Sequence, residues 1–271
     1  GGQTKTLYEI GPNSNLTGNN AYVNLGGSPW GTSNVMAKVS GITKTNNSVY
    51  RDNHGSGHCV KMTTHIETCK VLGLINIKVL AAGSIFLGDM KEPITGTKDG
   101  PKALNFGIPF THRPKALRYD YKVQVPGTPN RIRQTGFSKV TTVPGADYCI
   151  AMLLLQKRHE DANGNITAQR VGTVVVKYGK STGKWIEDAT YEIHYGNITG
   201  QSFYNAATMG LRSHDYARNS KGKSVLVKET GWAPADATPT HIVLQFSSSH
   251  GGAYVGTVGN TFWVDNVGLV Y

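Results

Sequence analysis

The sequence contains no uninterrupted apolar run of about 18 residues, the length that a membrane-spanning helix needs. Residues 1–30 also lack the apolar core of a secretory signal peptide. The chain is therefore predicted to have no transmembrane segment. Because it starts at Gly1-Gly2, which is typical of a processed product, earlier removal of an export signal or lipid anchor stays open as an interpretation.

Cysteine is scarce, with Cys59, Cys69 and Cys149 alone. Three are too few for a disulfide framework, and no C-x-x-C spacing predicts a zinc site. Cys59 and Cys69 could meet across neighbouring strands, whereas the strand-like sequence around all three cysteines equally favours buried, unreactive thiols.

Charged residues make up only 17% of the chain, and 28 Lys plus Arg against 17 Asp plus Glu give a net charge of 28 − 17 = +11. Such a balance can attract nucleic acid, anionic membranes or acidic glycans. The cations are scattered, however, and no nucleic-acid-binding motif surrounds them. We therefore favour solvated strand faces and predict no nucleic-acid partner.

Residues typical of strands and turns are abundant, including 33 Gly and 13 Tyr. With 271 residues the chain is long enough to bury a sizeable core. Strands are predicted at 35–40, 58–65, 71–80, 118–125, 147–157, 166–178, 185–195, 224–229, 240–247 and 261–271. Their separation by Gly, Pro, Asn and Ser clusters predicts an all-β sandwich or barrel.

The clearest local prediction is a hairpin over residues 148–178, because two apolar runs flank the turn-forming pair Asn163-Gly164. CIAMLLL is continuously apolar, so it should be a central strand covered on both faces, whereas WIEDATYEIHY alternates and should have one wet face. One short helix is expected near 205–212.

Few motifs carry catalytic or metal chemistry. His54, His58, His65 and Glu67 lie close in sequence, but without a zinc-protease helix we favour ordinary loop and strand histidines. A hydrolase would need two carboxylates on rigid elements, and the sequence does not pair the candidates: Glu67, Asp89, Glu92, Asp120, Asp147, Glu187, Asp188 and Glu192. Nucleophile-elbow, Walker and dinucleotide motifs are absent.

Aromatic side chains are better candidates, because they can stack on the apolar face of a sugar ring. The residues considered are Trp30, Trp185, Trp232, Trp263, Tyr195 and Tyr254, each with a core role as the alternative. Trp232, in the loop GWAPADATP, has few strand neighbours to bury it, and Trp185 comes next.

Several ordered segments carry a family resemblance: PWGTSN at 29–34, LAAGSIFLGDM at 80–90, FGIPFTHRPKALRYDYKV at 106–123, WIEDATYEIHY at 185–195, and THIVLQFSSSHGGAYVGTVGNTFWVDNVGLVY at 240–271. Together they resemble the family called putative carbohydrate metabolism domain. The last segment is the most specific, because a strand leads into a Ser- and Gly-rich loop and then into a final strand built around V-D-N-V.

The resemblance implies a jelly-roll β-sandwich similar to carbohydrate-binding modules and to galactose-binding-like domains. It also implies a bacterial lipoprotein of the cell envelope, either associated with the outer membrane or periplasmic. Such a protein would bind polysaccharide or oligosaccharide and associate with other glycan-uptake proteins of the outer membrane. Residues 1–27 are rich in Gly, Asn and Thr with few large apolar residues, so composition predicts an N-terminal approach segment with one or two edge strands there. Residues 28–271 are expected to form a single domain.

The same resemblance guides the expected site. In similar jelly rolls an acid at the position of Asp265 often helps to hold a structural calcium, here with carbonyls around 26–28 or 52–55. The alternative is that Asp265 ties the last strand to a turn. No other cofactor is expected. Polar groups near turns are also ligand-binding candidates, with structural roles as the alternative at each position: Asn34 with Ser33, Arg113 with His112, and Ser248 with Ser247 and Ser249. They join the aromatic candidates Trp30, Trp185, Trp232 and Tyr254.

The expected function is therefore non-catalytic recognition of polysaccharide outside the cytoplasm. A glycoside hydrolase or polysaccharide lyase on the same scaffold, and a structural or adhesive envelope protein, are the alternatives. Because β-sandwiches host many unrelated roles, the fold alone does not choose between them.

Overall fold

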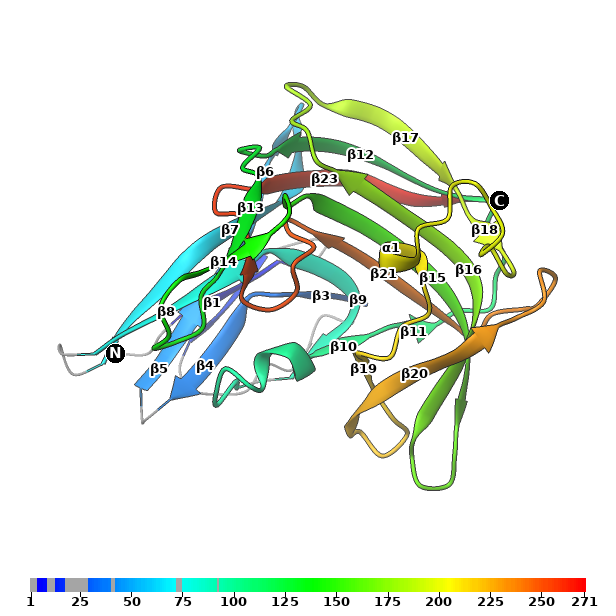
Figure 1. The fold of residues 1–271 in the computed structure, drawn as a ribbon, viewed down its shortest axis with the longest axis horizontal. Helices are drawn as coiled ribbons and strands as arrows, with labels where there is room; N and C mark the ends of the chain where they lie inside the picture. The colour runs from blue at the N-terminus through cyan, green and yellow to red at the C-terminus, as the bar shows by residue number, and fades with distance from the viewer. Residues whose placement is uncertain (1–3, 9–12, 18–28, 40–41, 72–74, 92) are drawn as a thin grey trace.

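The computed structural model describes residues 4–8, 13–17, 29–39, 42–71, 75–91 and 93–271 (Figure 1). The described chain consists of strands and turns, with one α-helix of a single turn, α1 (Ala206–Met209), and a 3-10 turn, η1 (Gly100–Lys102). The all-β prediction is confirmed, while the jelly-roll topology stays a prediction. No helix in the described part of the chain is long and apolar enough to cross a bilayer.

A six-stranded sheet forms the upper layer in Figure 1. Its strands, in spatial order, are β17 (Ile186–Glu192), β12 (Ala116–Gln124), β23 (Thr261–Val270), β7 (Gly57–Val71) and β6 (Val49–His54), with β8 (Ile75–Ala82) on the second half of β7. The terminal strand β23 lies between β12 and β7, antiparallel to both. The last strand of the sequence is thus central to this sheet.

A ten-stranded sheet forms the second layer. Its main path is β11 (Ile108–Pro109), β21 (His241–Ser247), β15 (Cys149–Glu160), β16 (Ile166–Tyr178), β20 (Ser224–Trp232), β19 (Asp215–Arg218), β10 (Leu104–Phe106), β9 (Ser84–Met90) and β3 (Trp30–Thr32), and β18 (His194–Tyr195) pairs with β16. Because β9 also pairs with β21, the strands from β21 round to β9 form a closed circuit of hydrogen-bonded neighbours.

The predicted hairpin is formed by β15 and β16, which pair antiparallel from Cys149↔Tyr178 to Glu160↔Ile166. Gly164 in its turn has φ +85°, a conformation that glycine adopts without steric cost. Residues Ala151 to Gln156 of β15 are all buried, as expected for a strand covered on both faces. Strand β17 is the edge of its sheet and has a largely exposed face. This confirms the prediction that the alternating segment WIEDATYEIHY has one face in contact with water.

The main core lies between the two sheets and is rich in aromatic residues. The rings of Tyr119 and Phe246 pack edge to face with their centroids 4.9 Å apart, and the centroids of Phe246 and Phe262 are 6.0 Å apart. The hydroxyl of Tyr119 hydrogen-bonds that of Tyr178 at 2.5 Å, so the buried phenols satisfy each other. Burying each such ring contributes about 1.5–3 kcal/mol, and these contacts hold the two layers together.

Alternate residues of β15 serve two different layers. Leu153 and Leu155 point into the sandwich core, whereas Met152 and Leu154 pack with Val243 on the opposite face. The ten-stranded sheet therefore has a second buried face, and that face supports the cavity described below.

Three short pairings complete the fold: β1 (Thr4–Tyr8) with β2 (Asn13–Thr17), β4 (Val35–Val39) with β5 (Ile42–Asn46), and β13 (Asn130–Arg133) with both β14 (Thr141–Pro144) and β22 (Val255–Gly256). Cys59 and Cys69 lie on the same strand, β7, ten residues apart, so they do not meet across neighbouring strands. Cys59 and Cys149 are free, buried thiols. Burial raises the pKa of Cys59 to about 12, so this thiol is unreactive at neutral pH.

Candidate functional site

A cavity of about 600 Å³ lies against the face of β15 and β21 that points away from the six-stranded sheet. Strands β4, β5 and β8 form one wall, and β10, α1 and the loops at 94–101 and 249–254 complete the lining. In Figure 1 these elements come from opposite sides of the molecule, β5 and β8 on the left and α1 and β15 on the right. The volume is within the range of ligand sites, about 300–1,000 Å³.

The floor of the cavity is mostly apolar. Met152 and Ile150 of β15 and Phe106 of β10 line it, and Phe106 is held by Phe86 at a ring distance of 5.0 Å. Gln245 of β21 lies beside Met152 in the register and also lines the cavity. Among the described residues, no protein group hydrogen-bonds the Gln245 amide, so its donors and acceptor are available to a ligand.

The charged groups in the lining are paired. Lys44 Nζ lies 2.6 Å from Glu67 Oε1, and Arg212 binds Asp215 through two hydrogen bonds of 2.5 and 2.8 Å. Burial raises the pKa of Asp215, but the hydrogen bonds and charge of Arg212 outweigh it and lower the pKa overall. The cavity therefore offers fixed donors and acceptors with little net charge.

A buried ion pair positions the Arg212 side of the cavity. Arg170 and Glu229, whose side chains are 0% and 1% exposed, meet at 2.5 Å, and Arg170 also donates to the carbonyls of Met209 and Gly210. Glu229 accepts the backbone N–H of Arg212 at 2.8 Å. The pair thus anchors the segment after α1 to the sheet beneath it.

A second polar unit fixes the opposite rim. Buried Asp147 accepts hydrogen bonds from Ser249 Oγ and His250 Nδ1, both at 2.7 Å, and from the backbone N–H of Thr257. Arg131 donates to His250 Nε2 at 3.1 Å. Because a guanidinium only donates, the imidazole is neutral, with its proton on Nδ1. His250 is therefore a rigid part of the wall.

Tyr254 is the predicted aromatic ligand residue that lines this cavity, and the polar candidates Ser33, Ser247 and Ser249 line it as well. It has φ +66°, an uncommon conformation for a residue with a side chain, which turns the loop inward. Its hydroxyl lies against Gly100, where a Cβ would come within 2.3 Å of it. The loop after the Ser-rich segment thus carries an aromatic ring to the cavity from the 249–254 side.

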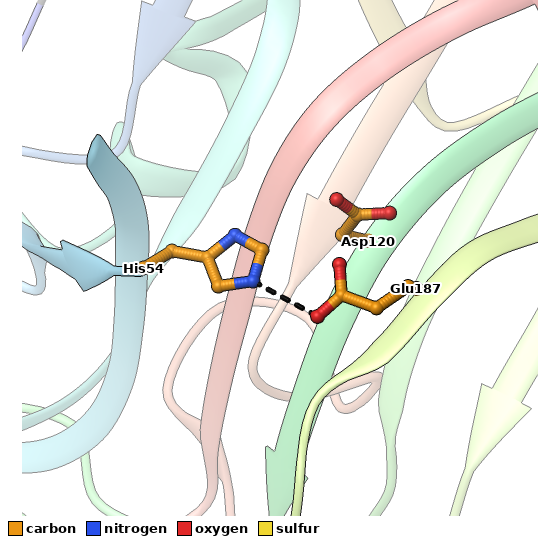
Figure 2. A group of neighbouring side chains, drawn as sticks. All are labelled: His54, Asp120 and Glu187. Carbon is orange, nitrogen blue, oxygen red and sulfur yellow. Dashed lines mark hydrogen bonds and ion pairs between the residues drawn. The ribbon is translucent and has the colours of Figure 1, made fainter. Parts of the chain in front are cut away.

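A separate group of side chains lies on the outer face of the six-stranded sheet, around His54 (Figure 2). His54 contacts Asp265 Oδ2 through Nδ1 at 2.8 Å and Glu187 Oε1 through Nε2 at 3.1 Å. Asp120 lies beside them, and Trp185 stacks on the His54 ring at 3.8 Å. Two of the predicted residues, Trp185 and Asp265, therefore meet here. The first segment considered for calcium carbonyls, 26–28, lies outside the described residues.

The remaining predicted residues lie elsewhere and are held by protein contacts. Asn34 is fully buried and bonds the backbone of Ser48 and Val49, and Trp30 packs against the main core. Ser248 is fully buried and bonds Thr64 Oγ1. These contacts connect strands, and the predicted ligand roles of the three residues stay predictions.

Arg113 and Trp232 flank one loop. Arg113 lies over the Tyr195 ring at 4.2 Å and donates to the carbonyls of Ala235 and Ala237. Trp232 is partly buried, with Arg170 5.5 Å from its ring centroid. The structure does not bring either residue to the cavity lining.

Sequence reasoning did not single out Gln245, Met152, Phe106 or Arg212. Phe106 and Gln245 lie in segments that carry the family resemblance, but nothing in those segments distinguishes them from other strand residues. It named Asp120 and Glu187 only within a list of unpaired acids. The continuous apolar run CIAMLLL was the available signal, since a second apolar face on β15 requires a second covering layer.

A scan against protein families matches residues 8–270 to one family, and the match begins 21 residues before the first segment that carries the resemblance in the sequence. Searches of curated proteins and of solved structures found no match. The chain belongs to the family described as putative carbohydrate metabolism domain.

Proposed function

We propose that this protein binds a neutral oligosaccharide or polysaccharide segment in the cavity between β4, β5 and β8 and the β15–β21 face, without cleaving it. The observation that carries the proposal is the lining itself. It combines an apolar floor, the unpartnered amide of Gln245, and charged groups that are already paired. The family's link to carbohydrate metabolism supports the ligand class.

The chemistry of a sugar fits this lining. The CH groups of a pyranose pack on Phe106, Met152 and Tyr254 as apolar surface, while its hydroxyls need both donors and acceptors. Gln245 supplies both, and the outer atoms of the Arg212–Asp215 pair add more. Because Lys44 and Arg212 are neutralised by Glu67 and Asp215, the cavity gives no excess charge to attract an acidic glycan.

Binding without turnover is favoured by the state of the acids. Among the described lining residues the carboxylates are Glu67 and Asp215, and each is bound to a cation. Hydrolysis of a glycoside needs one acid that is protonated near neutral pH, whereas the pKa of Asp215 is lowered. The cavity therefore lacks a suitable general acid among these residues.

The proposal extends to location and partners. A chain that binds polysaccharide would meet it outside the cytoplasm, in a bacterial cell envelope, with glycan-uptake proteins of the outer membrane as partners. This part of the proposal follows from the ligand class, which the family's description supports. Fractionation of cells that produce the protein from its native gene would test it, and recovery in the cytoplasm would contradict it.

The decisive experiment is isothermal titration of the full chain with neutral and acidic oligosaccharides. We compare wild type with Gln245→Ala, which removes the cavity amide, and with Gln201→Ala, a matched change at an exposed position. Saturable heat with a neutral glycan, weakened about 10-fold or more by Gln245→Ala and unchanged by Gln201→Ala, is expected.

Other outcomes overturn parts of the proposal. Continuous heat from bond cleavage would favour the hydrolase or lyase alternative. Binding that Gln245→Ala leaves unchanged would place the site outside the cavity. If no glycan binds to the folded chain, the structural or adhesive alternative becomes the better reading.

A further inference from the structure

We infer that His54, Asp120 and Glu187 form a binding site for a divalent first-row transition metal, with Asp265 orienting the histidine. The three ligands come from β6, β12 and β17, which are far apart in sequence. Strands β12 and β17 are neighbours, whereas β6 lies at the far edge of the same sheet, and His54 at its end brings its side chain close to Asp120 and Glu187 (Figure 2). This site is independent of the cavity and of the proposed glycan function.

The donor atoms have the spacing of a coordination shell. The ligand atoms of His54, Asp120 and Glu187 all lie within 4.8 Å of one another, and His54 Nε2 is 3.1 Å from Glu187 Oε1. When two ligand atoms each lie about 2.1 Å from the same ion and the ligand–metal–ligand angle is about 90–109°, the two ligand atoms are about 3.0–3.4 Å apart. A small adjustment of the exposed Glu187 side chain would bring all three onto one ion.

Asp265 orients the His54 ring by contacting the nitrogen that faces away from the proposed ion. Its Nδ1 lies 2.8 Å from Asp265 Oδ2, and the Trp185 ring covers one face of the imidazole at 3.8 Å. Metal-binding histidines usually donate their second N–H to a carboxylate, which fixes the tautomer and aims the other nitrogen at the ion. In this protein Asp265 holds Nδ1, and Nε2 points toward Glu187.

The register of the sheet places like charges opposite each other. Asp120 and Asp265 are cross-strand partners on β12 and β23, and carboxylates in that relation repel. Asp120 is held in place by hydrogen bonds from Asn266 Nδ2 at 2.6 Å and from the Asp188 N–H at 2.6 Å. With Glu187, three carboxylates surround one imidazole in a chain of net charge +11. This concentration of negative charge favours a divalent cation.

Other charged groups near the cluster do not neutralise it. Arg118 lies 3.7 Å from the exposed carboxylate of Asp188, and Lys122 lies over the rings of Trp185 and Trp263. Both contacts direct these cations to other partners. Without a metal, the protonated His54 ring is the cation that bridges Asp265 and Glu187.

The donor set selects the kind of metal. One imidazole with two carboxylates suits Zn²⁺, Mn²⁺ or Fe²⁺, whereas Ca²⁺ takes only oxygen ligands and needs 6 to 8 of them. Metal binding must displace the proton from His54 Nε2, so affinity should fall as the pH is lowered. Three protein ligands leave further positions on the solvent side for water.

The test is a Zn²⁺ titration of the full chain after chelator treatment at pH 7.5, with a competing indicator. We compare wild type with His54→Ala and with Glu187→Gln, an isosteric change at an exposed side chain that leaves the fold undisturbed. His58→Ala is the matched control, because His58 is an exposed histidine in the same hairpin. Circular dichroism confirms that each variant is folded.

One equivalent of Zn²⁺ is expected, with affinity reduced 10-fold or more in His54→Ala and Glu187→Gln and unchanged in His58→Ala. Asp265→Asn should also weaken binding by about 10–100-fold, and Co²⁺ should give visible absorption bands that His54→Ala removes. The inference is overturned if no saturable Zn²⁺ binding occurs, if His54→Ala binds as tightly as wild type, or if equimolar Ca²⁺ displaces the metal. None of these results bears on glycan binding at Gln245, so the two proposals fail separately.

Discussion

Replacing Glu229 by Gln should strongly destabilise this protein, because Glu229 is the buried partner of a fully buried arginine. Oε1 accepts hydrogen bonds from Gln156 Nε2 and Arg170 Nε, both at 2.7 Å. Oε2 accepts from Arg170 Nη2 at 2.5 Å and from the Arg212 N–H at 2.8 Å. An amide keeps the shape but loses the charge and turns an NH₂ group toward two of these donors.

The magnitude follows from that geometry. Two charge-assisted hydrogen bonds are lost, each worth about 1.5–3 kcal/mol, and Arg170 keeps a buried charge without a counter-ion. Removing one partner of a buried pair typically costs about 3–5 kcal/mol, which agrees with the bond count. We expect Glu229→Gln to lower the free energy of unfolding by about 3–5 kcal/mol.

Urea denaturation followed by circular dichroism measures this loss. Glu192→Gln, the same change at an exposed position on β17, is the control and should stay within about 0.5 kcal/mol of wild type. Because Arg212 is held by Glu229, glycan affinity should also fall in Glu229→Gln. A loss below about 1 kcal/mol, close to that of the control, would refute the reasoning.

Three further predictions follow from other parts of the fold. Burial raises the pKa of Asp147, but hydrogen bonds from His250, Ser249 and the Thr257 N–H lower it overall. The ionised carboxylate therefore stabilises the folded chain above about pH 4, and this contribution is lost as the pH falls through the lowered pKa of the folded state. The stability gap between wild type and Asp147→Asn in urea titrations should therefore shrink between pH 7 and pH 3, and a constant gap would contradict this. Burial lowers the pKa of His54, but hydrogen bonds to Asp265 and Glu187 raise it overall. The contribution of protonated His54 to folding stability is therefore complete below about pH 6.5 and is lost as the pH rises through the raised pKa of the folded state. His54→Gln should thus cost more stability at pH 6 than at pH 8.5 in metal-free buffer, and the reverse order would exclude the imidazolium. Gly88→Ala should destabilise the chain by about 3 kcal/mol or more in thermal or urea unfolding, because Gly88 has φ +142° and its Cβ would lie 1.9 Å from the Asn105 carbonyl oxygen, whereas Gly179→Ala, with open space around it, should be nearly neutral.

The elements that the sequence predicted are those with a strong local signal. The β15–β16 hairpin combines long apolar strands with an Asn-Gly turn, so its pairing follows from neighbouring residues alone. The sequence predicted no strand at 84–90, although β9 joins both β21 and β10. Gly83 and Gly88 interrupt that segment and would signal a turn, but here they allow the close approach of the Ser48 and Asn105 carbonyl oxygens. Local composition therefore predicts the opposite of what the packing requires.

The cavity could not be predicted from the sequence, because no single segment contains all of its walls. Its floor uses the second face of β15, and its opposite wall comes from β4, β5 and β8, more than 65 residues earlier. The sequence showed that β15 is buried on both faces, without showing what covers the second face. Tyr254 was predicted as a ligand residue only as one of several aromatic side chains that could stack on a sugar. It lies in the lining at a position with a positive φ, which sequence composition does not reveal.

The His54 cluster illustrates why paired acids are harder to predict than strands. Asp120 and Asp265 are 145 residues apart and become neighbours only through the register of β12 on β23. That register shifts between Arg118 and Asp120, and β12 shifts again against β17 between Tyr119 and Tyr121. A one-residue slip turns a side chain to the other face of a sheet, so these two bulges decide that Asp120 meets His54 and Glu187 on the outer face. Bulges leave little trace in composition, which is why the metal ligands inferred here emerge from strand pairing and could not be predicted from the nearby histidines in the sequence.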